Sequence, residues 1–100
     1  MRRATTPTHT FCFPTEYQGK ISKVLVTYSQ NGVIVLQKKL DDGVFENNIF
    51  KITLTQEETN LFNNFQVVEI QVRALTQDNS AVASDIYEVP CQRVLNDEVL

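Results

Sequence analysis

Residues 20–40 read KISKVLVTYSQNGVIVLQKKL and carry the strongest fold signal in the chain. Apolar and polar residues alternate on both sides of Asn31-Gly32, and Val24, Val26 and Tyr28 share one face of the first run. Alternation with a period of two is typical of a half-buried β-strand. Asn-Gly between two such runs favours a type I′ turn, because both central residues need a positive φ. We therefore predict a β-hairpin with strands at residues 20–30 and 33–40.

The same alternation predicts further strands on both sides of this hairpin. They cover Thr8–Phe13, Val44–Glu46, Ile49–Leu54, Gln66–Leu75, Ala81–Val89 and, as a last edge strand, Cys91–Leu95. Turn residues separate them at Pro14, Asp41-Asp42-Gly43, Asn47-Asn48, Asp78-Asn79-Ser80 and Pro90. The faces that we expect to be buried carry Phe11, Phe13, Val24, Val26, Ile52, Leu54, Val68, Ile70 and Val72.

One short helix is predicted after Leu54. Thr55-Gln56-Glu57-Glu58 fits a capping box, in which the Thr55 hydroxyl accepts from the third residue's N–H and Glu58 reaches back. Such a helix is too short to connect parallel strands, so the fold class is all-β, an antiparallel, immunoglobulin-like β-sandwich of six to seven strands with one short connecting helix. We expect a flexible arm at residues 1–6, a single domain at 7–95 and a polar tail at 96–100.

The composition is that of a globular domain. The chain has 100 residues, of which 42% are apolar and 21% charged, so it can bury a core and is not intrinsically disordered. A net charge of −3 argues against a nucleic-acid partner. No apolar run approaches the ~20 residues of a membrane span, and polar residues follow Met1-Arg2-Arg3 where a signal peptide would be apolar. We expect synthesis in the cytoplasm and no membrane partner.

No set of residues points to catalysis. His9, the only histidine, lies in a predicted strand with no identifiable nucleophile beside it. Asp41-Asp42 and Glu57-Glu58 read as a turn and a helix cap, and the three glycines stand too far apart for a phosphate-binding loop. Cys12 and Cys91 are expected to be buried or half-buried thiols, with a disulfide as the alternative. We therefore expect no enzyme, cofactor, metal site or small-molecule substrate.

Several stretches resemble small β-sandwich proteins encoded by tailed phages and prophages of gut bacteria. The likeness covers nearly the whole chain and rests on residues 5–11 (TTPTHTF), 26–32 (VTYSQNG), 54–59 (LTQEET), 69–73 (EIQVR) and 83–86 (ASDI). The order of elements is also similar to the N-terminal domain of phage baseplate upper proteins, at the level of the fold. The resemblance implies a virion component of the tail, baseplate, connector or capsid surface, with virion proteins and its own copies as partners, and carries over no catalytic residue.

The chain ends are the candidate assembly sites. They fit no local hydrophobic pattern, and an extended arm can add to a neighbour's sheet edge. The residues concerned are Arg2, Arg3, Thr5, Thr6, Pro7, Thr8, Val99 and Leu100. Mere solvated tails are the alternative for these ends. For the whole protein, the alternative function is a small phage-encoded inhibitor that binds a host protein.

Overall fold

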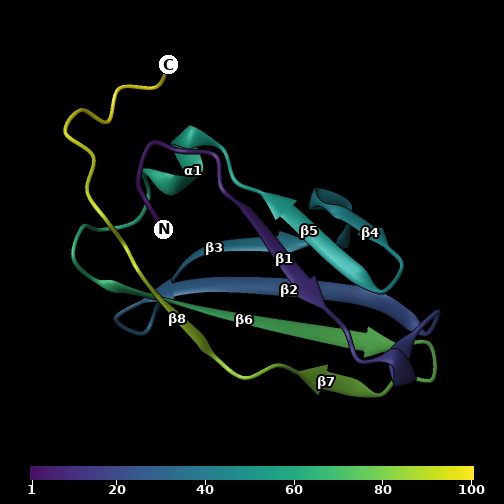
Figure 1. The fold of residues 1–100 in the computed structure, drawn as a ribbon. Coiled ribbons are helices and arrows are strands. Elements are labelled where there is room, and N and C mark those ends of the chain that lie inside the picture. Colours follow the sequence, from purple (N-terminus) through teal and green to yellow (C-terminus); the bar gives the residue numbers. More distant parts are fainter.

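The computed structural model describes all 100 residues and arranges eight strands in two antiparallel sheets (Figure 1). The small sheet has the order β1-β5-β4, and the large sheet has the order β3-β2-β6-β7, with β8 also paired to β6. The strands are β1 (Thr8–Cys12), β2 (Ile21–Gln30), β3 (Val33–Lys39), β4 (Val44–Glu46), β5 (Ile49–Thr53), β6 (Val67–Thr76), β7 (Ala81–Ala83) and β8 (Tyr87–Pro90). The predicted all-β antiparallel sandwich is confirmed, with eight strands in place of six to seven.

The hairpin of β2 and β3 forms where the sequence predicted it. Asn31 and Gly32 have φ angles of 50° and 73°, the left-handed conformation that a type I′ turn needs. A second turn of this kind joins β4 to β5, with φ angles of 51° at Asn47 and 65° at Asn48. Both turns tolerate these angles because Asn and Gly enter the left-handed region at low cost.

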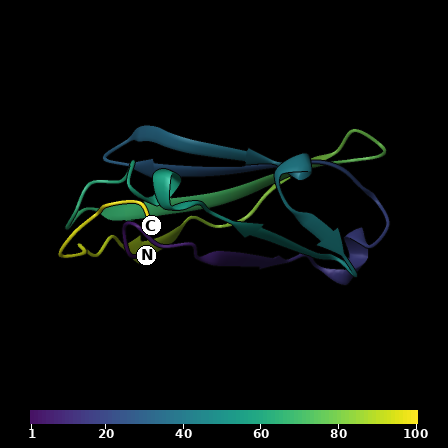
Figure 2. The same cartoon turned by 90° about the horizontal axis from the view of Figure 1, so that it is seen from above.

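The core lies between the two sheets and follows the predicted faces closely. Seven of the nine expected core residues are buried, and Phe11 and Phe13 are half-buried at the margin. Tyr28, Phe50 and Phe62 are the largest side chains that are fully enclosed. The molecule is elongated, 46 × 27 × 17 Å, and Figure 2 shows this long, thin shape from above.

The predicted capping box is present at α1 (Gln56–Thr59). The Thr55 hydroxyl accepts from the Glu58 N–H at 3.1 Å, and the Glu58 carboxylate accepts from the Thr55 N–H at 2.9 Å. Two single 3₁₀ turns, Thr15–Tyr17 and Leu40–Asp42, follow β1 and β3. The second contains Asp41-Asp42, which the sequence identified as a turn.

Two predicted strands were wrong in their extent. Residues 81–89 form β7 and β8 rather than one strand, because the three residues 84–86 face only Gln71 and Val72 of β6. Because three residues stand opposite two, this segment carries one extra residue, which forms a β-bulge. Within the bulge the Ser84 hydroxyl accepts from the Val72 N–H at 3.0 Å. Residues 91–95 form no strand; a single bridge pairs Gln92 with Arg2.

Candidate functional site

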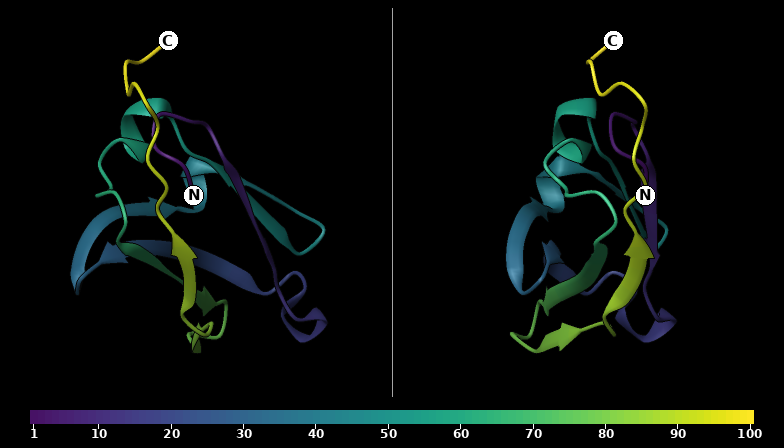
Figure 3. Two further views of the ribbon diagram at one scale, coloured as in Figure 1. Left: turned by 60° about the vertical axis from the view of Figure 1, so that its left-hand side comes forward. Right: turned by 90° about the vertical axis from the view of Figure 1, so that its left-hand side faces the viewer.

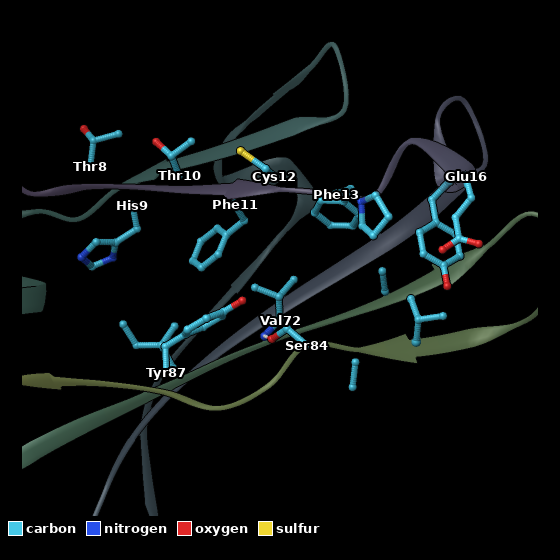
Figure 4. Close-up of a pocket in the computed structure, with 16 residues that line it drawn as sticks. Thr8, His9, Thr10, Phe11, Cys12, Phe13, Glu16, Val72, Ser84 and Tyr87 are labelled. Atoms are coloured by element: carbon cyan, nitrogen blue, oxygen red, sulfur yellow. Dashed lines mark hydrogen bonds between the residues drawn. The ribbon is translucent and has the colours of Figure 1, made fainter.

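The largest concave feature is a groove of about 790 Å³ on the side of the sandwich where the two sheets diverge. β1 and the turn after it form one wall, and β6, β7 and β8 form the other (Figure 4). Ten of its sixteen lining residues are hydrophobic. An apolar concavity of this size is large enough to hold a chain segment or a small molecule.

Alternation along β1 gives this wall of the groove its apolar character. His9 and Phe11 point toward β6 and β8, whereas Thr8, Thr10 and Cys12 point away from them (Figure 4). Burial agrees, since His9 and Phe11 are half-buried and the other three side chains are exposed. The opposite wall presents Ile70, Val72 and Ala74 from β6, together with Val82 and Tyr87.

Unpaired strand edges border the groove on both sides. β1 pairs only with β5, and β7 and β8 pair only with β6, so each of these strands has one free edge. The free edge presents backbone N–H and C=O groups that lack a partner strand. An extended segment placed here can hydrogen-bond to an edge and bury its apolar side chains between the sheets.

His9 connects the two sheets at the inner end of the groove. Its Nδ1 lies 2.7 Å from the Tyr28 hydroxyl oxygen, and the two ring centroids are 5.5 Å apart. Burial of the ring, with a smaller effect of the N-terminal charge, lowers the pKa of His9. Burial also raises the pKa of Tyr28, and the nearby Glu58 carboxylate adds to this shift. Both groups are therefore neutral near pH 7, which suits a neutral hydrogen bond between the two sheets.

The N-terminal residues lie against the domain, where they make hydrogen bonds to segments that are distant in the sequence. The Arg2 guanidinium donates to the Arg93 carbonyl at 2.7 Å, and Arg3 donates to the Asn60 carbonyl at 3.0 Å. The Thr5 N–H donates to the Thr59 hydroxyl at 3.1 Å. Each partner is distant in the sequence, so no local pattern could have revealed these contacts.

The other candidate assembly residues of the N-terminal segment are Thr6, Pro7 and Thr8, which lead into β1. Thr6 is exposed, and the Pro7 carbonyl accepts from the Leu54 N–H at 3.0 Å. The Thr8 hydroxyl lies 2.8 Å from that of Thr53 on β5. Thr8 is the one candidate arm residue that also lines the groove.

The C-terminal tail is held by exposed polar contacts while its apolar side chains face solvent. The Leu100 N–H donates to the Gln56 side chain at 2.7 Å, and Asp97 lies 3.3 Å from Arg3. Val99 is 44% exposed and Leu100 is fully exposed. Both chain ends lie at the α1 end of the molecule (Figure 3).

The two cysteines are free and differ in environment. Cys91 is buried in the core, and burial raises the pKa of its thiol. Cys12 is exposed, so the expectation of two buried or half-buried thiols was wrong for this residue. Its side chain points away from the groove, on the outer face of β1 (Figure 4).

Two further observations concern metal binding and membrane-spanning helices. No group of three or more His, Cys, Asp or Glu side chains is placed to hold a metal ion. No helix combines the length and the apolar character needed to cross a membrane.

The sequence did not reveal the groove. Its one local signal was Ser84-Asp85, a polar pair inside an apolar run, where the bulge that borders the groove lies.

Comparison with protein-family models, with curated proteins and with solved structures finds no match for this chain.

Proposed function

We propose that this protein is a structural component of a bacteriophage virion that acts by protein–protein assembly and not by catalysis. The groove between β1 and β7–β8 carries this proposal, because it combines an apolar lining with free strand edges. A surface of this kind suits the capture of an extended chain segment. The resemblance to small tailed-phage proteins supplies the biological setting, and other virion proteins and copies of this chain are the partners.

The C-terminal tail supports the same role from the other end of the molecule. Leu95, Val99 and Leu100 leave apolar side chains in solvent on a segment held by polar contacts at the surface. Exposed polar contacts contribute little to stability, so the tail can leave the domain at low cost. We propose Val99 and Leu100 as assembly contacts, while Arg2, Arg3 and Thr5 also anchor the N-terminal segment to the domain.

Mass spectrometry of purified particles tests the proposed role. Many copies per particle are expected of a structural component, whereas absence from particles together with capture of a host protein favours the inhibitor.

Two variants then test the groove. Tyr87→Glu places a charge in the groove, and Ile86→Glu is the matched control, because Ile86 is equally exposed (54% against 52%) but does not line it. Tyr87→Glu is expected to reduce incorporation into particles and Ile86→Glu to leave it unchanged. Equal incorporation of both variants would rule out the groove as the contact.

A further inference from the structure

The solvent-facing side chains of β6 form a self-complementary row. Along the strand they are Val67, Glu69, Gln71, Arg73 and Leu75, and the residues between them are buried in the core. Gln71 is the middle residue of the row. On one side of it stand Glu69 and then Val67, and on the other side stand Arg73 and then Leu75. A second copy running in the opposite direction would therefore place opposite charges, and apolar residues, against each other.

The charges in this row have no partner within the chain. The two ion pairs of the structure are Arg3–Asp97 and Lys38–Glu58, and neither involves β6. Glu69 stands directly opposite Glu88 of β8 in the sheet register. Like charges directly opposite each other destabilise a sheet. This acidic pair is therefore a site where a cation from outside the chain is stabilising.

Arg73 is the matching cation at the other end of the row. It is exposed, and its cross-strand neighbours are Leu25 on β2 and Ala83 on β7, neither of which can pair with a guanidinium. Arginine binds carboxylates through a planar fork of donors, so it can engage two acidic side chains that lie side by side.

From this pattern we propose that the outer face of the large sheet binds a second copy of the chain in a two-fold dimer. The axis runs across the strands at the level of Gln71, so that β6 of each copy lies antiparallel over β6 of the other. Arg73 of one copy then faces Glu69 and Glu88 of the other, twice by symmetry, and Leu75 faces Val67. Thr27 lies beside Gln71 in the register, which places a small polar residue next to the axis.

The size of this face predicts a weak dimer. β2 and β6 have ten residues each. At ~3.3 Å per residue and ~4.8 Å between strands, four strands cover about 600 Å² per copy. Stable interfaces bury about 800 Å² per partner, so the contact is at the low end of the range. This inference goes beyond the proposed function, because the face points away from the groove and a dimer can form with or without a virion role.

Sedimentation equilibrium of the purified protein over a concentration series tests the dimer. The wild-type protein should self-associate, and more weakly at about 0.5 M salt than at about 0.05 M, because screening weakens ion pairs. Arg73→Glu should raise the dimer dissociation constant by about tenfold or more, since the new carboxylate would face the two acidic side chains of Glu69 and Glu88 in the other copy. The double variant Arg73→Glu, Glu69→Arg exchanges the two charges and should recover most of the lost association.

Lys51→Glu is the matched control, because it changes the net charge equally on an exposed residue of β5 in the small sheet. It should leave the dissociation constant unchanged. A wild-type protein that stays monomeric up to about 1 mM, where even a weak specific contact would show, overturns the proposal. Equal effects of Arg73→Glu and Lys51→Glu, or a double variant as weak as the single one, overturn it as well. Presence in virions with no solution dimer would leave the proposed function intact.

Discussion

The Nδ1 atom of His9 lies 2.7 Å from the hydroxyl oxygen of Tyr28, and this contact joins the small sheet to the large one. His9 belongs to β1 and Tyr28 to β2, so the hydrogen bond spans the sandwich beside the groove. Tyr28 is fully buried, and its ring also packs edge-on against Phe62 at 6.1 Å. The contact therefore ties β1, which forms one wall of the groove, to the large sheet.

Removal of the Tyr28 hydroxyl should weaken this connection. We expect Tyr28→Phe to lower the free energy of unfolding by about 1 kcal/mol, because His9 loses a hydrogen-bond partner in a half-buried position. Urea denaturation measures the change. Tyr87→Phe is the control, since Tyr87 is 52% exposed and makes no side-chain hydrogen bond, and its stability should match the wild type. An unchanged Tyr28→Phe variant would show that the hydrogen bond adds no net stability.

Stability should fall in mild acid because of His9. Burial lowers its pKa below the unfolded value of about 6.5, so the folded state binds the proton more weakly than the unfolded chain does. Above about pH 6.5 both states are neutral and the effect vanishes; below it, protonation favours unfolding. The free energy of unfolding, measured between about pH 5 and 8, should decline toward pH 5 in the wild type and stay flat in His9→Gln.

The two carboxylates with shifted pKa values, Glu58 and Asp78, do not obscure this pH window. Hydrogen bonds from Lys38 and Thr55 outweigh burial and lower the pKa of Glu58, and a hydrogen bond from Thr76 lowers the pKa of Asp78. Groups with lowered acidic pKa values lose their stabilising effect only as the pH falls below about 4.5. If the free energy of unfolding of His9→Gln declined toward pH 5 as much as that of the wild type, the pH dependence would belong to another group.

The register of β6 is tested by truncation of a core residue. Ile70 is 5% exposed and packs between the sheets, so Ile70→Ala should cost about 2–4 kcal/mol of stability through lost burial and a cavity. Leu61→Ala removes a similar side chain that is 57% exposed, and it should change stability by less than about 0.5 kcal/mol. The free energies of unfolding of the two variants, measured by thermal or urea denaturation, test the register. Equal losses of stability in Ile70→Ala and Leu61→Ala would contradict it.

The α1 cap is tested at Thr55. Thr55→Ala removes the acceptor for the Glu58 N–H and should cost about 0.5–2 kcal/mol. Thr55→Ser keeps the hydroxyl and should retain most of the stability. If Ser and Ala variants unfold at the same urea concentration, the hydroxyl is not the source of the effect.

Gly43 should be sensitive to substitution for reasons of space. A Cβ at this position would lie 2.4 Å from the Lys51 carbonyl oxygen and 2.9 Å from the Phe50 ring. Because both groups belong to the well-packed strand β5, Gly43→Ala should cost about 1–3 kcal/mol. Gly32→Ala meets no neighbouring atom and strains only its positive φ, so it should cost less, about 1 kcal/mol. The order of the two urea midpoints tests this reasoning.

The sequence by itself determined the features that depend on neighbouring residues. The Asn31-Gly32 turn, the Thr55–Glu58 capping box and the inward face of β6 each follow from the chemistry or the alternation of a short segment. Such features form wherever the chain can adopt the required φ angles and bury one face. For this reason the sandwich class could be predicted before any contact between the sheets was known.

Only the tertiary structure decided the features that join distant segments. The Ser84 bulge exists because β7 and β8 must both pair with β6, and Arg2 and Arg3 dock on residues about 60 to 90 positions away. The groove arises because β1 pairs with β5 and leaves its other edge open beside β8. Pairing between remote strands depends on the packing of the whole core, which alternation within one strand does not encode.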